Sequence, residues 1–342
     1  MKIYTRVLYV KGENTVANIV LSRNGKDTPF AIHGKLHVEG SHLIDEKGQI
    51  CELRGLSTHN LSTYPEYINE EAITQFTDEY GISIFRLALY SAEADDCKGY
   101  ADGDDAHRAD LEKLIVKGVE ICAKLGIYAL VDWHILFDYN PNMNADMSEH
   151  FWNTICPQLK EYDNVIYEIC NEPNMDIKRQ CDETSWEDIT KYANRIIPVI
   201  RKLDSEKVVI VGTPTWSQRV DQAADAPLSF NNIMYTLHFY ADTHREDLRE
   251  KLRYALSKNL PIFVTEFGIC NAAGDGDVND EETNLWLKLL QENKISYVLW
   301  NLSNKNETSA ILKDSCTKTA GFTEDDLSPC GQRFRTMMSK RY

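Results

Sequence analysis

The sequence has 342 residues, 43% of them hydrophobic and 26% charged, a length that suits one α/β barrel or two ordinary domains rather than a small binding module. Asp and Glu number 53 against 37 Lys and Arg, and the formal net charge of −16 argues against a nucleic-acid partner. No apolar run reaches the roughly 18 residues of a membrane-spanning helix, and residues 1–10 lack the cleavage site of a signal peptide, so we expect neither.

A small β-hairpin and eight buried strands are predicted along the chain. Residues 34–53 alternate apolar and polar positions around two turn signals, Glu39-Gly40 and Lys47-Gly48. Eight β-rich runs overlap or follow this segment, and seven of them hold apolar residues on successive positions, as strands of a buried parallel sheet do. The runs are residues 50–56, 82–88, 127–133, 165–170, 208–212, 234–239, 262–266 and 297–301.

Segments of helical period separate these runs. Asn69 is a candidate N-cap for a helix that ends at Gly81, residues 108–125 predict a second helix that ends at Gly126, and residues 186–197 carry an apolar stripe. Eight strands that alternate with helices predict the α/β class and a single (β/α)8 barrel, and we expect the hairpin to close the floor of this barrel. A doubly wound sheet is the second candidate.

Catalytic residues of a barrel lie where its strands end, on the carboxyl-terminal face. Polar or aromatic side chains stand in or just after the predicted strands. They are His59, Tyr64, Arg86, Tyr90, His134, Asn171, Glu172, Trp216, His238, Tyr240, Glu266 and Trp300. A barrel end with only a structural role does not need such a set, so we expect the side chains to line one bowl.

Two of these residues, Glu172 and Glu266, end the fourth and seventh strands on opposite sides of a closed barrel. Hydrolysis of a glycosidic bond needs such a pair, one carboxyl group to protonate the leaving oxygen and one to attack or to activate water. Arg86 and Tyr240 are expected to keep Glu266 ionised, and a site near His238 and apolar surface is expected to raise the pKa of Glu172. A structural ion pair is the alternative role for each glutamate.

Metal binding is the alternative role for the histidines at the strand ends. His59, His134 and His238 stand at three strand ends, but a metal site would also need carboxylates that converge on the same point, so no metal is expected. The acidic loop 274–280 resembles a calcium loop, yet Trp286 stands where an EF-hand needs Glu, and we interpret the loop as a cleft wall. Trp216, Trp300, Tyr90 and Tyr64 offer flat faces on which sugars stack.

These residues resemble glycoside hydrolase family 5, and within it the bacterial endo-β-1,4-glucanases of subfamily 2. The matching motifs are L-R-G-L-S-T-H (53–59), F-R-L-A-L-Y (85–90), V-D-W-H (131–134), Y-E-I-C-N-E-P (167–173), H-F-Y (238–240), T-E-F-G (265–268) and W-N-L-S (300–303). The resemblance begins near residue 31, which implies a catalytic domain over 31–342. Residues 1–30 form an extension of unknown role, either the remnant of a preceding module, an artificial addition or a strand docked on the barrel.

The resemblance implies a retaining mechanism, with Glu172 as acid/base and Glu266 as the nucleophile that forms a covalent glycosyl intermediate. It implies that Asn171 holds the sugar 2-hydroxyl, and that no cofactor takes part. The remaining binding residues implied by the resemblance are Arg86, His134, His238, Tyr240 and Trp300 around the cleaved sugar, Lys305 and Glu307 on the non-reducing side, and Trp216 on the leaving-group side.

The chain departs from the family pattern at Thr63, where the subfamily usually has a tryptophan; Tyr64 follows. We expect a monomeric enzyme that cleaves cellulose-like or mixed-linkage β-glucan polysaccharides or oligosaccharides. Mannan, xyloglucan or xylan as substrate, a cytosolic oligosaccharide-processing glucanase and a sugar-binding pseudoenzyme are the alternatives. The function suggests secretion, but nine cysteines without a C-x-x-C pair suggest reduced structural thiols and so leave a cytoplasmic location open.

Overall fold

Eight parallel strands close into a barrel in the computed structural model, which describes residues 18–93, 98–175, 183–340 and 342. The strands are β5 (Arg54–Thr58), β6 (Ile84–Tyr90), β7 (Tyr128–His134), β8 (Val165–Glu168), β9 (Val209–Val211), β10 (Ile233–Thr236), β12 (Ile262–Gly268) and β13 (Tyr297–Leu302). They neighbour one another in chain order, and β10 also pairs with β12. This last pairing closes the sheet, so the predicted barrel is confirmed and the doubly wound alternative is wrong.

The strand register brings the ends of neighbouring strands together. β6 and β7 pair over their full lengths, from Ile84 opposite Tyr128 to Tyr90 opposite His134. A short strand, β11 (Phe239–Tyr240), continues the line of β10 and pairs with the end of β12. The register therefore sets Tyr90 beside His134, and Tyr240 beside Gly268, two residues beyond Glu266, at one face of the barrel.

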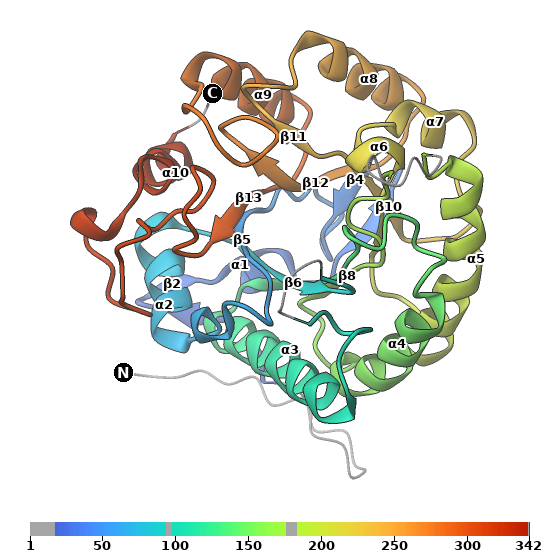
Figure 1. The fold of residues 1–342 in the computed structure, drawn as a ribbon, viewed down its shortest axis with the longest axis horizontal. Coiled ribbons are helices and arrows are strands. Elements are labelled where there is room, and N and C mark those ends of the chain that lie inside the picture. The colour runs from blue at the N-terminus through green and yellow to red at the C-terminus, as the bar shows by residue number, and fades with distance from the viewer. Residues whose placement is uncertain (1–17, 94–97, 176–182, 341) are drawn as a thin grey trace.

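Helices form a ring around the strands (Figure 1). They are α2 (Glu70–Gln75), which runs into a π-helical turn (Phe76–Tyr80), α3 (Asp105–Leu125), α4 (Ala145–Leu159), α5 (Trp186–Leu203), α7 (Val220–Asp225), α8 (Glu246–Ser257), α9 (Asp280–Glu292) and α10 (Pro329–Ser339). Shorter elements are α1 (Pro29–His33), α6 (Pro214–Ser217) and two 3-10 turns (Pro65–Tyr67 and Glu324–Asp326).

The expected helix signals largely act as predicted. The Asn69 side chain accepts hydrogen bonds from the first turn of α2, and Gly81 (φ 73°) and Gly126 (φ 67°) end their helices in the left-handed region. The predicted start of the second helix is wrong by three residues. α3 begins at Asp105 because the Asp104 side chain caps it by accepting from the His107 backbone N–H.

The predicted hairpin consists of β3 (His37–Glu39) and β4 (His42–Ile44), and it closes the barrel floor. Leu36 and Leu43 pack into an apolar cluster with inward-facing strand residues. The strand residues are Ile84, Tyr128, Leu130, Ile166, Ile210, Met234, Phe263 and Val298, joined by Leu53 and Val208, which directly precede β5 and β9. The lower half of the barrel is thus a dry core.

The described part of the N-terminal extension lies against the end of α3. β1 (Ser22–Arg23) pairs with β2 (Lys26–Asp27), the Val20 backbone N–H donates to the Ala123 carbonyl, and the Phe30 N–H donates to that of Gly126. Residues 1–17 lie outside the described residues. The division of the chain at residue 30 stays a prediction.

Seven of the nine cysteines lie within the described residues, and all seven are buried and unpaired, as expected for structural thiols. Cys97 and Cys181 lie outside that part of the chain. Among the described residues, no helix combines the length and apolar character needed to cross a membrane.

Candidate active site

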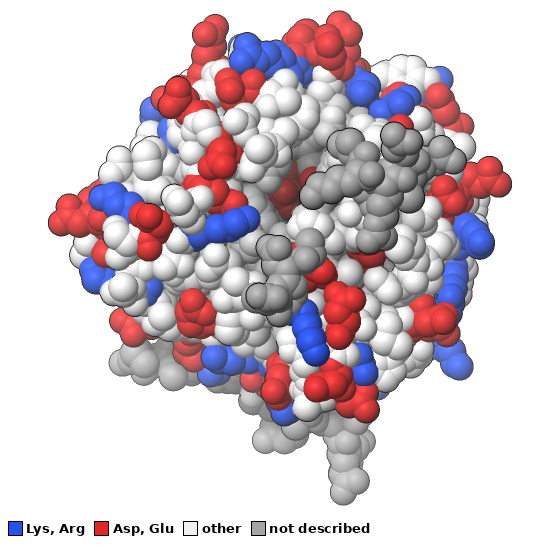
Figure 2. Space-filling view, viewed as in Figure 1, with Lys and Arg blue, Asp and Glu red and all other residues white. Residues whose placement is uncertain are grey.

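A cavity of about 530 Å³ opens at the carboxyl ends of the barrel strands. Figure 2 shows a hollow near the middle of this face, with acidic atoms inside it. Predicted residues that line the cavity are His59, Tyr90, His134, Glu172, Trp216, His238, Tyr240, Glu266, Trp300, Lys305 and Glu307. Arg86 and Asn171 lie fully buried beneath it. Tyr64 does not line the cavity; its ring packs edge-on against His59, with 5.1 Å between ring centroids.

Arg86, on β6, lies at the centre of a buried charge network. Its guanidinium contacts Asp132 on β7 (3.0 Å), Glu168 on β8 (2.9 Å) and Glu266 on β12 (3.0 Å), and it donates to Asn171 Oδ1 (2.6 Å). Arg86, Asp132 and Glu168 are fully buried. One cation thus fixes three strands and an active-site amide relative to one another, because breaking any contact would leave a buried charge unpaired.

Glu266 receives two polar contacts that favour its ionised form. Arg86 Nη1 donates to Oε2 (3.0 Å), and the Tyr240 hydroxyl donates to Oε1 (2.9 Å). Burial, with the nearby Glu172 charge, nevertheless raises the pKa of Glu266 to about 7. The two contacts are those expected from the sequence, but burial outweighs them, so Glu266 ionises near neutrality instead of well below it.

Glu172 lies in a different environment, with its side chain 12% exposed to the cavity. Its Oε1 is 2.9 Å from His238 Nδ1. Burial raises the pKa of Glu172 to about 8, with Glu168 and Asp132 adding to the rise and Arg86 opposing it. The pKa of Glu172 is therefore raised more than that of Glu266, the order that an acid and a nucleophile require.

A second hydrogen-bonded group orients His134 and Asn171. His134 Nδ1 is 2.7 Å from Asp132 Oδ2, and its Nε2 lies 3.2 Å from the Asn171 amide nitrogen. Because Asn171 Nδ2 donates to this Nε2, the neutral ring carries its proton on Nδ1 and donates to Asp132. The Asn171 side chain is held between this ring and Arg86, at the cavity floor.

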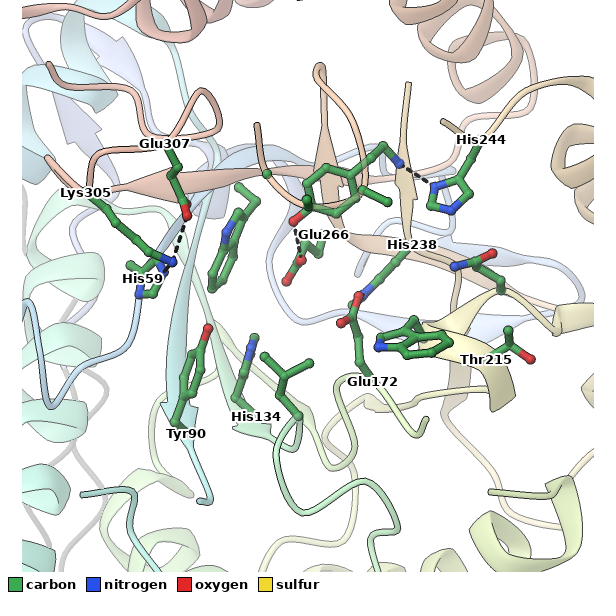
Figure 3. Close-up of a pocket in the computed structure, with 18 residues that line it drawn as sticks. His59, Tyr90, His134, Glu172, Thr215, His238, His244, Glu266, Lys305 and Glu307 are labelled. Atoms are coloured by element: carbon green, nitrogen blue, oxygen red, sulfur yellow. Dashed lines mark hydrogen bonds and ion pairs between the residues drawn. The ribbon is translucent and has the colours of Figure 1, made fainter. Parts of the chain in front are cut away.

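Aromatic rings form one wall of the cavity (Figure 3). His134 stacks between Tyr90 (4.1 Å between centroids, 17° between planes) and Trp300 (5.3 Å, 16°). His59 stacks on Tyr90 at 5.9 Å. This wall offers flat apolar faces suited to the C–H faces of a pyranose ring.

The two rims of the cavity differ in character. On one rim Lys305 Nζ contacts Glu307 (2.7 Å) and lies 3.4 Å from His59 Nε2, and these charged groups suit sugar hydroxyls. On the other rim Thr215, Trp216 and Ser217 have φ values of 58°, 53° and 58°. Such a left-handed turn without glycine costs about 1–3 kcal/mol per residue. Ser217 Oγ, which donates to the Asn171 carbonyl (2.6 Å), helps to hold the turn and so places Trp216 over the cavity.

Several cavity residues were not predicted from the sequence. They are Leu136, Thr215, Gln218, His244, Ala272 and Ala273, whereas Gly274, which also lines the cavity, opens the loop 274–280 predicted to be a cleft wall. His244 follows Tyr240 by one turn, and its Nδ1 accepts the Tyr240 backbone N–H (2.8 Å), so in the neutral ring the proton is on Nε2. Asp132 and Glu168 were also missed as site residues, although each is an acidic residue inside an otherwise apolar strand, a signal that could have revealed them.

Glu172, His238 and Glu266 are the described residues that come closest to a metal-ligand group, with one ligand atom of each within 4.8 Å of the others. Both nitrogens of His238 already contact partners, Glu172 at Nδ1 and Thr265 Oγ1 at Nε2 (both 2.9 Å). Glu266 is likewise held by Arg86 and Tyr240. The atoms that would ligate a metal are already hydrogen-bonded to one another or to neighbouring side chains. This arrangement is unfavourable for metal binding and suits proton transfer.

Comparison with known proteins agrees with this geometry. Residues 44–306 match the family model for cellulase (glycosyl hydrolase family 5). The chain is 42% identical over 303 residues to endoglucanase A of Butyrivibrio fibrisolvens and 40% identical over 299 residues to an endoglucanase of Clostridium saccharobutylicum. These alignments cover 88% and 87% of this chain but 68% and 63% of the relatives, so the chain spans about two thirds of their lengths.

A solved structure extends the comparison to three dimensions. The catalytic domain of endoglucanase Cel5A from Thermobifida fusca, in complex with cellotetraose, superposes with a TM-score of 0.82 at 32% identity. The match covers 92% of this chain and 100% of that one. The family model, the curated relatives and the fold agree with the two-glutamate cavity, and the chain belongs to glycosyl hydrolase family 5, the cellulase family, and is a glycoside hydrolase.

Proposed function

We propose that the protein is a retaining endo-β-1,4-glucanase. The observation that carries the proposal is the pair Glu172 and Glu266, which face one cavity with carboxylate oxygens within 4.8 Å of each other. Carboxyl groups of retaining enzymes lie about 5–5.5 Å apart, and those of inverting enzymes about 6.5–9.5 Å. A water molecule does not fit between this pair and a sugar, so direct attack by a carboxylate is favoured.

The contacts of the two glutamates divide the chemistry between them. Glu266, ionised and held by Arg86 and Tyr240, attacks C1 of the sugar, while Glu172 gives its proton to the leaving glycosidic oxygen. The C1–O bond breaks and a glycosyl–Glu266 ester forms. Glu172, now ionised, then takes a proton from water as that water attacks C1 and releases Glu266.

Cellulose-like and mixed-linkage β-glucans are the proposed substrates. Trp300, supported by the stacked rings of His134 and Tyr90, and Trp216 on the other rim supply flat faces for glucose rings. The relatives are named endoglucanases, and the Thermobifida fusca structure holds cellotetraose. In the arrangement implied by the family, Asn171 contacts the 2-hydroxyl, and Lys305 and Glu307 contact sugars on the non-reducing side. His59, 3.4 Å from Lys305, is a further binding residue of the proposal.

A product profile with an anomer assay tests the proposal. Purified enzyme is incubated with carboxymethylcellulose, mixed-linkage β-glucan, xyloglucan, mannan and xylan, and viscosity and reducing ends are recorded together. We expect rapid loss of viscosity on the first two and, by ¹H NMR, the β-anomer as the first product. The α-anomer would contradict retention, and faster cleavage of mannan, xyloglucan or xylan would reassign the substrate.

We further propose that the enzyme acts outside the cell as a monomer. Polymeric glucan is an extracellular substrate, and the proposed acid/base, the nucleophile and their hydrogen-bond partners form a complete site within one chain, so the proposed mechanism needs no second copy. Light scattering after size-exclusion chromatography and fractionation of the source cells test the two statements. A stable dimer would contradict the first, and activity confined to the cytosol would contradict the second and favour an oligosaccharide-processing glucanase.

A further inference from the structure

A chain of short hydrogen bonds runs from the buried Glu168 to the acid/base Glu172. Glu168 Oε1 lies 2.6 Å from Thr265 Oγ1, Thr265 Oγ1 lies 2.9 Å from His238 Nε2, and His238 Nδ1 lies 2.9 Å from Glu172 Oε1. Glu168, Thr265 and His238 are nearly or fully buried. The family mechanism described above makes no use of Thr265 or Glu168, so their role is open.

Counting donors along this chain leaves two arrangements of its protons while His238 is neutral. The Thr265 hydroxyl has a third neighbour, the Thr236 hydroxyl at 2.6 Å, which accepts the Thr265 backbone N–H and is free to donate its own proton to Thr265 Oγ1. With Thr236 as donor, Thr265 can give its one proton to Glu168 or to His238, but not to both. If Thr265 donates to Glu168, His238 must donate to Thr265 from Nε2. The bare Nδ1 of His238 then accepts a hydrogen bond from protonated Glu172. If Glu168 is protonated instead, every bond reverses, and His238 Nδ1–H donates to an ionised Glu172.

Arg86 decides between the two arrangements. Its Nε donates to Glu168 Oε2 at 2.9 Å, which favours the ionised form of Glu168. Among the described residues, Glu172 has no Lys or Arg within ion-pair distance; its recorded partner is His238. The proton of the chain is therefore more stable on Glu172 than on Glu168.

We propose that Thr265, anchored by ionised Glu168, is a positioning residue that fixes His238 as the Nε2–H tautomer. The bare Nδ1 of the ring then accepts a hydrogen bond from protonated Glu172. This inference rests on the proposed function and explains how the proton is kept on the acid/base Glu172. His238 then points a lone pair on Nδ1, and not an N–H, at the carboxyl group of Glu172, so it does not stabilise the Glu172 anion. The proton is held in place until the leaving glycosidic oxygen takes it.

Burial and the Asp132 charge raise the pKa of Glu168, whereas Arg86, His238 and the Thr265 hydrogen bond oppose that rise. The Arg86 and Thr265 contacts are the geometry that favours the Glu168 anion. Arg86, Asp132 and Glu266 belong to the same buried network, and Tyr240 donates to Glu266. Burial lowers the pKa of His238 to about 4, so the ring is neutral near pH 6 and above. His134 makes the opposite choice, with its proton on Nδ1 toward Asp132, and serves as an internal reference for the other tautomer.

Nuclear magnetic resonance of the histidine rings tests the proposal on the wild-type protein. Protein labelled with ¹⁵N-histidine is recorded near pH 6, above the pKa of His238 and below that of Glu172, through two-bond ¹H–¹⁵N couplings. The His238 signals are assigned by their loss in His238→Gln. We expect the Nε2–H pattern; an Nδ1–H or imidazolium pattern would overturn the proposal. A sample that gives the expected pattern but does not cleave β-glucan would instead overturn the proposed function.

Variants test the part played by the hydroxyl. In Thr265→Val the ring is free to turn to Nδ1–H and donate to Glu172, so the basic limb of kcat/KM against pH should move down by about one unit. Thr265→Ser keeps the hydroxyl and should restore both the wild-type tautomer and the wild-type limb. Thr213→Val removes a buried strand-end hydroxyl whose recorded acceptor is a backbone carbonyl, and it is the matched control.

The outcomes of these variants separate a positioning role from a structural one. A Thr265→Val protein that folds, as judged by circular dichroism, but keeps the wild-type tautomer and pH profile would overturn the proposal. A Thr265→Ser protein that behaves like Thr265→Val would do the same. If Thr265→Val does not fold, the wild-type spectrum and Thr265→Ser still decide the question.

Discussion

The barrel interior has two layers of inward-facing side chains, and the upper layer lies two residues further along the strands than the lower one. Along six of the eight strands, the inward-facing residue of the lower layer is apolar, and the residue two positions later is polar or aromatic and lies at or directly beneath the cavity. The pairs are Ile84 and Arg86, Leu130 and Asp132, Ile166 and Glu168, Met234 and Thr236, Phe263 and Thr265, and Val298 and Trp300. The period of two residues that builds one core therefore also builds the catalytic floor on top of it.

The two layers are held together by different physics. The lower layer gains stability from buried apolar area, at roughly 25 cal/mol per Å². The upper layer buries Arg86 with Asp132, Glu168 and Glu266, where desolvation opposes the Coulomb attraction, so such a cluster is weak evidence for stability. The comparison teaches that the lower layer carries the fold while the upper layer is retained for its chemistry.

Replacing Glu266 should give the largest effect on this upper layer. Glu266→Gln keeps the shape but removes the attacking oxygen anion, and kcat should fall on the order of 10⁴- to 10⁶-fold, as when a nucleophile is removed from other hydrolases. Initial rates on a soluble cello-oligosaccharide measure the loss, with circular dichroism as the check on folding. Glu172→Gln should cost about 10²–10⁴-fold on the same substrate. Near-normal hydrolysis by Glu266→Gln would refute its assignment.

Removing the shared cation should damage both stability and activity. Arg86→Met leaves three buried carboxylates without their common partner and should cost about 3–5 kcal/mol of unfolding free energy at neutral pH. The loss should shrink at acid pH, where those carboxylates bind protons. Arg195→Met is the matched control, because Arg195 and its two ion-pair partners, Asp146 and Glu149, are all exposed, and it should cost about 1 kcal/mol or less. Equal losses in denaturant titrations would contradict the role of burial.

A change in the lower layer should separate stability from catalysis. Ile166→Ala, beneath Glu168, should cost about 2–5 kcal/mol of unfolding free energy because it leaves a cavity in a dry core. At temperatures well below unfolding, kcat/KM should stay within about twofold of wild type, because the upper layer keeps its ion pairs. Calorimetry and initial rates on the same preparation provide the measurement. A large drop in kcat/KM with only a small loss of stability would show that the two layers are coupled.

The same two layers show how far sequence reasoning reaches. Eight β-rich runs, seven of them continuously apolar, predicted all eight strands. Strand-end residues such as Glu172 and Glu266 were predicted because position alone marks them. The partners of Arg86 at Asp132 and Glu168 were missed, because only closure of the sheet brings these strands around one guanidinium. The left-handed turn at Thr215–Trp216–Ser217 was missed because no glycine marks it.

Removing the hydroxyl of Tyr240 should have the smallest effect of these changes, and the effect should fall on the pH dependence of kcat/KM. It donates to Glu266 and stabilises its ionised form, so Tyr240→Phe should raise the pKa of Glu266 above its present value of about 7. Activity requires Glu266 ionised and Glu172 protonated, so the acid limb of kcat/KM should move to higher pH by about one unit, while the basic limb set by Glu172 stays in place.

The pH optimum of Tyr240→Phe should therefore narrow and its maximum should fall, because the fraction of enzyme in the active protonation state shrinks. Tyr167→Phe is the matched control: it removes a buried hydroxyl that donates to Asp204 (3.2 Å), a carboxylate outside the cavity, and should leave both limbs unchanged. Movement of the acid limb to lower pH in Tyr240→Phe would mean that the hydroxyl does not stabilise the anion. The upper layer would then tune Glu266 through Arg86 alone.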